Sequence, residues 1–180
     1  MQKNNSRDET EQRKLQPKSG SEHAGPDECL SVIPLLLSLE EISRETYIKR
    51  FGEDNLHDNP ALKQAERIAA VTINPELLEA SYLSNLEYLS LTIFDNQHYT
   101  AIIESRAFYG NTFSTSWKVE SFELATMTLS STEKQLVVTL KFQKEKVLYL
   151  IQYKNAAAEH YLYKINTENI DSFKCTVLQS

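Results

Sequence analysis

The chain has 180 residues, 41% of them hydrophobic, which is enough for one folded domain with a core of its own. Its net charge of -6 argues against a surface that binds nucleic-acid phosphates, because such surfaces rely on clustered Lys and Arg side chains. Two cysteines, Cys29 and Cys175, are too few for the disulfide framework of a small secreted domain, and no stretch is apolar for long enough to span a membrane as a helix.

The beginning of the chain is almost wholly polar. Residues 1–27 lack the apolar side chains whose burial offsets the entropy cost of ordering, so we expect a disordered tail there. The apolar run Leu30–Leu39 has the length of a signal-peptide core, but Asp27 and Glu28 stand where such a peptide carries positive charge. We therefore identify no signal peptide in this sequence.

Residues 28–66 are expected to form an apolar arm, or a short helix followed by a loop. Apolar residues recur at helical spacings within Leu35–Phe51, and Ser38 with Glu41 three residues later matches a capping box. Gly52 ends this segment, and the Asp, Asn and Pro residues after it are typical of a loop. A short helix and a loosely packed arm both fit this pattern.

Residues 67–180 are expected to form a β-rich domain. Its first strand is predicted over Arg67–Ile73 and ends at Asn74-Pro75, because the residue before a proline is restricted. Pro75 suits the first position of a short helix, which the leucines of the following segment extend to Leu83.

Two turns divide the next strands. Alternating residues up to Phe94, the pair Asp95-Asn96 and a returning strand from His98 predict a hairpin. Gly110 beside Asn111 predicts a turn or bulge before the strand that carries Trp117, because both residue types tolerate a positive φ. Residues 122–129 alternate again and predict one further strand.

The clearest strand pattern lies between residues 136 and 165. Apolar residues recur there at every second position, in two runs separated by the polar turn 143–146: Leu136, Val138, Leu140 and Phe142, then Val147, Tyr149, Ile151 and Tyr153. A third strand follows at residues 161–165. About eight strands between Arg67 and Ile165 predict a mainly β fold, an antiparallel meander that forms a curled sheet, a sandwich or a barrel-like roll with one or two short helices.

The residues that carry chemistry in enzymes are sparse. The histidines, His23, His57, His98 and His160, form no His-Glu-x-x-His motif, and there is neither a glycine-rich phosphate loop nor a Gly-x-Ser-x-Gly elbow. His98 and His160 could meet across a sheet and bind a metal, but two ordinary strand positions are the more common explanation of such histidines. We therefore expect no enzyme activity, no catalytic residue and no cofactor.

Aromatic side chains are the remaining candidates for a binding surface. Tyrosines are concentrated in the last two predicted strands, where aromatic pairs ordinarily stabilise a sheet and can also form a contact surface for another protein. The candidate partner-binding residues are Trp117, Tyr149, Tyr153, Tyr161 and Tyr163.

The order of the segments carries a resemblance. The chain runs through LLLSLEEISRETY, RIAAVTINPELLEASYL, the hairpin LEYLSLTIFDNQHYTAIIESR, NTFSTSW, and the strands VVTLKF, VLYLIQY and HYLYKINTENI. This order resembles the N-terminal propeptide-type region of bacterial secreted, reprolysin-like zinc metallopeptidases, over residues of about 33 to 173. In that family a catalytic domain with the His-Glu-x-x-His motif follows, which is not seen here, and Lys118 replaces the glycine that usually follows the tryptophan.

The resemblance implies a non-catalytic domain that binds, inhibits or helps to fold a zinc metallopeptidase. It also implies a secreted or periplasmic location, and it makes Cys29 a weak candidate ligand for the partner's zinc, since no cysteine-switch consensus surrounds it. The alternative is a free-standing β-sheet module that binds a protein or ligand of another kind. A small hydrolase is a third alternative, which no nucleophile or metal spacing favours.

Overall fold

The alternating apolar residues form the strands that were predicted from them. The computed structural model describes residues 32–53, 55, 60–132 and 135–168. The last six strands are β5 (His98–Tyr109), β6 (Thr112–Val119), β7 (Ala125–Ser131), β8 (Leu136–Phe142), β9 (Val147–Lys154) and β10 (Glu159–Asn166). In β8, all four residues of the predicted inward run are buried, whereas Val137 between them is 39% exposed. Period-two alternation therefore sets which face of each strand turns inward.

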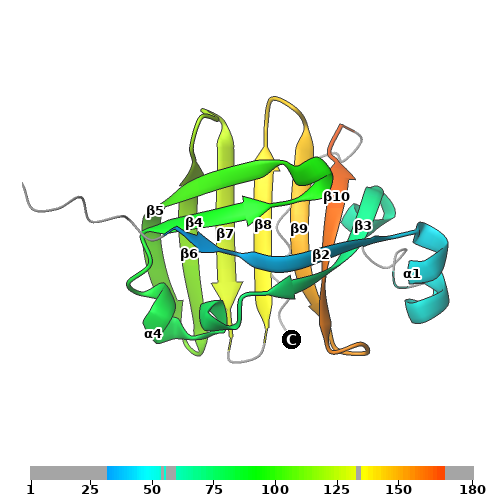
Figure 1. The fold of residues 1–180 in the computed structure, drawn as a ribbon, viewed down its shortest axis with the longest axis horizontal. Coiled ribbons are helices and arrows are strands. Elements are labelled where there is room, and N and C mark those ends of the chain that lie inside the picture. The colour runs from blue at the N-terminus through cyan, green and yellow to red at the C-terminus, as the bar shows by residue number, and fades with distance from the viewer. Residues whose placement is uncertain (1–31, 54, 56–59, 133–134, 169–180) are drawn as a thin grey trace, which may run out of the picture.

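These strands belong to a single sheet that curls into a nearly closed barrel (Figure 1). Antiparallel pairing of successive strands runs from β4 (Tyr88–Thr92) through β10, and β10 then pairs antiparallel with β3 (Ala65–Ile73). The eight strands β3 to β10 are the number expected between Arg67 and Ile165, and the predicted mainly β, barrel-like class is confirmed.

One stretch of chain supplies both outer strands of this sheet. β1 (Ile33–Pro34) pairs parallel with β4, and β2 (Leu36–Ile42) pairs antiparallel with β3. Leu35 lies between them: its N–H donates to the Ser90 carbonyl at 2.7 Å, and its carbonyl accepts from the Asn74 N–H at 3.0 Å. A single residue thus joins the two edges of the sheet.

The helices are short and their ends are specified locally. Helix α1 (Arg44–Phe51) begins after Ser43, whose side chain accepts a hydrogen bond from the Thr46 N–H, and it ends at Gly52 with a φ of 84°. The predicted helix after Asn74 forms two single turns, the 3-10 turn η1 (Pro75–Leu78) and α4 (Ala80–Leu83), and one further turn, α3 (Pro60–Lys63), precedes β3.

Two hydrophobic cores occupy the two faces of the sheet. The larger core fills the barrel and contains Leu35, Trp117 and Leu162, each 0% exposed. The smaller core lies where α1 covers β10 and β3, and its centre is Tyr47 against Tyr161 and Tyr163. β9 and β10 are therefore buried on both faces, which explains their nearly continuous apolar sequence.

Two expectations about the segments change, and a third falls outside the described residues. The helical spacing predicted from Leu35 is wrong for Leu36–Ile42, which is strand β2, and the helix begins only after Ser43, so Ser38 and Glu41 form no capping box. The expected division at residue 67 does not separate the sheet, because β1 and β2 lie before it and β3 begins at Ala65. The expected tail at residues 1–27 lies outside the described residues.

Truncation of the Leu35 side chain tests whether the Leu35 junction stabilises the barrel. We expect Leu35→Ala to lower the free energy of unfolding by about 2–5 kcal/mol, because the lost side chain leaves a cavity at the junction of the two sheet edges. Val137→Ala, which truncates an exposed strand residue, should cost about 1 kcal/mol or less. Urea unfolding followed by fluorescence measures both, and equal losses would show that the Leu35 junction does not hold the barrel together.

Candidate functional site

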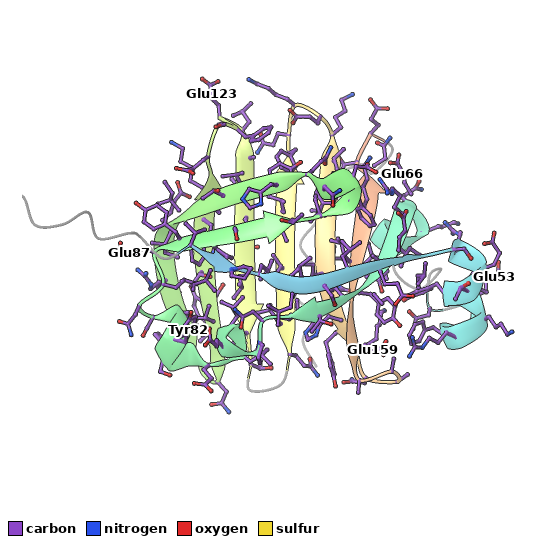
Figure 2. The ribbon with its side chains drawn as sticks, in the orientation of Figure 1. Glu53, Glu66, Tyr82, Glu87, Glu123 and Glu159 are labelled. Carbon is purple, nitrogen blue, oxygen red and sulfur yellow. The ribbon has the colours of Figure 1, made fainter. Side chains whose placement is uncertain are left out.

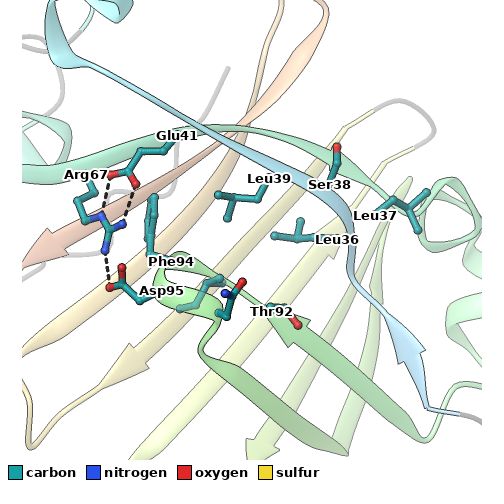
Figure 3. Close-up of a pocket in the computed structure, with 11 residues that line it drawn as sticks. Leu36, Leu37, Ser38, Leu39, Glu41, Arg67, Thr92, Phe94 and Asp95 are labelled. Carbon is teal, nitrogen blue, oxygen red and sulfur yellow. Dashed lines mark hydrogen bonds and ion pairs between the residues drawn. The ribbon is translucent and has the colours of Figure 1, made fainter.

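A cleft opens in the barrel wall where β2 and β4 separate. Beyond Leu35 and Ser90, β2 follows β3, while β4 continues to the 3-10 turn η2 (Phe94–Asn96) that leads into β5. The resulting cleft has a volume of about 460 Å³, within the usual range for ligand sites (Figure 3). Its lining residues are Leu36, Leu37, Ser38, Leu39, Glu41, Arg67, Thr92, Ile93, Phe94, Asp95 and Asn96.

The β2 side of the cleft is largely apolar. Leu36 and Leu39 are half-buried and pack against the large core, and Figure 3 shows both of them reaching from β2 toward the β4 side. Leu37 is 56% exposed, a larger fraction than that of the exposed aliphatic residues Val32, Leu124 and Val137. The register of β2 on β3 shifts between Leu36 and Ser38, so Leu37 has no partner residue in that ladder.

Backbone groups also face the cleft. In the order of the described strands, β2 has a hydrogen-bonded neighbour on one side only, and the neighbour of β4 on this side, β1, ends at Pro34. An edge strand leaves every second N–H and carbonyl without a ladder partner. The cleft therefore has two strand edges as its walls.

Arg67 ties the walls together at the open end. Its guanidinium donates two hydrogen bonds to Glu41 of β2, both at 2.7 Å, and one to Asp95 of η2 at 2.5 Å. The same group lies over the ring of Phe94, 4.4 Å from its centroid. Bidentate pairing and ring stacking both require the planar guanidinium, so these contacts are specific to arginine.

The backbone conformation of η2 positions the carboxylate of Asp95. Asp95 and Asn96 have φ values of 58° and 55°, in the left-handed region that Asp and Asn adopt more readily than most residues. The predicted Asp95-Asn96 turn is thereby confirmed. Its contact with Arg67, from β3, brings together residues that are 28 positions apart.

Arg67 also sets the ionisation of its partners. Its hydrogen bonds hold the pKa of Glu41 and of Asp95 below their ordinary values, and the same bonds raise the pKa of Arg67. All three groups are thus charged near neutral pH, and the triad carries one net negative charge. Lys164 lies close enough to act on Asp95, but its own ammonium is 3.7 Å from Glu66.

The aromatic candidates lie mostly in the cores. Trp117, Tyr161 and Tyr163 are 0% exposed, Tyr149 is 5% exposed, and only Tyr153 is half-buried. Tyr163 and Tyr47 share a hydrogen bond at 2.9 Å, and the Trp117 indole donates to Thr115 at 2.7 Å, so their polar atoms are satisfied internally. Partner binding by these five stays a prediction, and of the five only Tyr153 is accessible at the surface.

The two histidines proposed to share a metal do not meet. His98 begins β5 and contacts Thr92. His160 is the second residue of β10, at the opposite end of the barrel, where its Nε2 accepts a hydrogen bond from the Leu136 N–H at 3.2 Å. Within residues 32–53, 55, 60–132 and 135–168, no three His, Cys, Asp or Glu side chains gather as a potential metal site. Cys29, Cys175, His23 and His57 lie outside the described residues.

Acidic side chains lie on several sides of the barrel. Figure 2 shows the carboxylates of Glu53, Glu66, Glu87, Glu123 and Glu159 distributed around its outline. The expectation that the protein does not bind nucleic acid stays a prediction. In the described part of the chain, no helix has the length and apolarity needed to cross a membrane.

Sequence reasoning did not identify Glu41, Arg67 and Asp95 as a site. Each was placed in a local element, but their convergence depends on pairing between strands that are distant in the sequence. The one available signal was a charged residue at the start of the otherwise apolar segment Arg67–Ile73.

Comparisons with known proteins identified no relative of this chain. No protein-family model matches the chain, and neither a curated protein nor a solved structure matches it at a significant level. The resemblance to metallopeptidase propeptide regions therefore stays a prediction.

The Arg67 contacts can be tested by a conservative change. We expect Arg67→Lys to lower the free energy of unfolding by about 1 kcal/mol at low salt, because lysine keeps the charge but loses the bidentate and stacked geometry. Since the pKa of Glu41 and of Asp95 is depressed, this difference should be present above about pH 4 and fade as the pH falls further. Arg106→Lys, at a side chain that donates to the Leu86 carbonyl, is the control. Equal losses in the two variants would contradict a special role for Arg67.

The buried imidazole of His160 should lower the free energy of unfolding in mildly acidic solution. Burial lowers its pKa below the ordinary value, so between that pKa and about pH 6.5 the unfolded chain binds a proton that the folded protein excludes. We expect the His160 contribution to be present above about pH 6.5 and to be lost as the pH falls through the lowered pKa. NMR titration of the imidazole measures this pKa. A His160 pKa at or above the ordinary histidine value of about 6.5 would contradict the assignment.

Proposed function

We propose that this protein is a non-catalytic binding module that captures an extended segment of another protein as an added strand in the cleft. The supporting observation is the outer edge of β2, which has no strand partner among the described residues. This edge faces a cleft of about 460 Å³ and lies opposite the end of β4 that extends beyond β1. Extended peptides bind such edges through main-chain hydrogen bonds, while neighbouring side chains select among sequences.

The apolar surface of the cleft supports the same function. An exposed edge strand is an aggregation hazard that proteins usually cover, shorten or protect with charges. Here Leu37 is 56% exposed beside the edge, and Leu36 and Leu39 are only half-buried. A bound segment would cover these leucine side chains and would also form hydrogen bonds with the backbone of the β2 edge. One occupant would therefore account for both the exposed leucines and the exposed edge.

A zinc metallopeptidase is the partner that the sequence resemblance implies, and it fits this proposal as one source of the captured segment. In that case the module would bind, inhibit or assist the folding of the peptidase through the β2 edge. The suggested approach of Cys29 to the partner's zinc concerns a residue outside the described part of the chain. Strand capture in the cleft does not depend on it.

The proposal can be tested with a displayed library of random hexapeptides selected on the immobilised full chain. We expect enrichment of peptides that are poor in proline, because proline cannot donate to a ladder. On binding, such peptides should slow hydrogen exchange of amides in β2 and at Thr92, while amides in β7 and β8 keep their rates.

Two variants locate the binding. Leu37→Lys replaces the exposed leucine of the cleft with a charge and should weaken the selected peptides about tenfold, because it removes apolar contact area. Val137→Lys makes the same change at an exposed residue of β8 and should leave affinity unchanged. Enriched peptides that bind both variants equally, or a library without enrichment, would overturn the proposed function.

A further inference from the structure

The directions of the two walls determine how a captured strand must run. β1 is parallel to β4, and β2 continues β1 through Leu35 without reversing, so β2 and β4 point the same way. Any strand between them is consequently parallel to both or antiparallel to both. Antiparallel pairing is slightly more stable per residue, and it is the arrangement of every neighbouring pair in this sheet except β1 and β4.

The antiparallel direction orients the ends of the occupant. β2 runs from the junction at Leu35 toward Ile42, and β4 runs from Ser90 toward the turn that contains Asp95. A strand that is antiparallel to both therefore has its N-terminal end at the open end of the cleft, beside Arg67, and its C-terminal end at Leu35. The N-terminal residues of the occupant meet the charged group.

The charges at the open end favour a cation. Glu41 and Asp95 contribute two negative charges against the one positive charge of Arg67, and their side chains are 45% and 66% exposed, so a further donor can reach both. Lys164 and Glu66 nearby form their own ion pair and add no net charge. Deeper in the cleft, Leu36 and Leu39 favour apolar side chains at alternate positions.

On this basis we infer that the occupant is a segment of a partner protein that runs antiparallel to β2 and β4, with a Lys or Arg near its N-terminal end followed by apolar residues at every second position. This inference rests on the proposed function and adds direction and charge to it. The triad of Glu41, Arg67 and Asp95 then acts as the specificity determinant of the cleft, in addition to linking its walls.

Synthetic peptides with blocked ends separate these features, since blocking removes the terminal charges. The parent probe is Lys-Thr-Val-Thr-Val-Thr, and its controls carry Gln or Glu in the first position or present the parent sequence in reverse order. By fluorescence anisotropy with the full chain, we expect the parent to bind about fivefold more tightly than the Gln peptide, with the Glu peptide and the reversed peptide weaker still.

A charge-removing variant tests the named contact. Asp95→Asn keeps a residue that tolerates the left-handed conformation and removes one carboxylate. It should reduce the advantage of the Lys peptide over the Gln peptide to less than about twofold. An unchanged advantage would overturn the role of the triad.

Other outcomes would separate failure of this inference from failure of the proposed strand capture. Peptides that bind in a Leu37-dependent manner, but irrespective of their first residue or order, would overturn the inference and leave strand capture standing. A dimer that the parent peptide dissociates in analytical ultracentrifugation would assign the cleft to a second copy of the chain. Tenfold tighter binding by the full-length variant Phe173→Asp/Val177→Asp would assign the cleft to residues 169–180. Either result would overturn a partner's segment as the occupant.

Discussion

The architecture depends on the two backbone hydrogen bonds of Leu35. Its N–H donates to Ser90 of β4 at one edge of the sheet, and its carbonyl accepts from Asn74, which follows β3 at the other edge. Leu35 is therefore the point at which the chain passes from one edge to the other. Before Leu35 the chain follows β4, and after it the chain follows β3. Because β3 and β4 diverge beyond Leu35, β2 stays beside β3 and moves away from β4. The barrel is therefore closed by backbone hydrogen bonds at Leu35 and open between β2 and the end of β4.

The open end is bridged by side chains instead of backbone. Arg67 connects β2 to the turn after β4 through two carboxylates and the face of Phe94, at a place where no ladder links these segments in the described structure. Half-exposed ion pairs contribute less to stability than a buried junction, because water competes for the same groups. The barrel is thus held firmly at Leu35 and more weakly at Arg67, an arrangement that suits the admission of a ligand between β2 and β4.

Local patterns predicted those parts of the fold that local physics decides. The alternation in β8, the Asp95-Asn96 turn and the turn at Gly110 follow from side-chain period and backbone preference, and all three are present. Strand β2 was predicted as helix or arm because its leucines suit either period, and pairing with β3 decides its conformation. Aromatic content likewise marked Trp117 and Tyr161 as notable without indicating that they face the interior. The convergence of Glu41 with Arg67 spans 26 positions and has no local signal.

The pairing of β10 with β3 has a consequence for the protein as it is made. Successive strands from β4 to β9 find their partners nearby in the chain, but β3 pairs with residues about 90 to 100 positions later, such as Val71 with His160 and Ala65 with Ile165. On a ribosome, which delivers the chain from its N-terminus, one side of β3 stays without its neighbour until almost the whole described sequence has emerged. Strand β2 is available to the other side of β3 from the start, so the earliest strands to appear protect each other while the last one is still being synthesised.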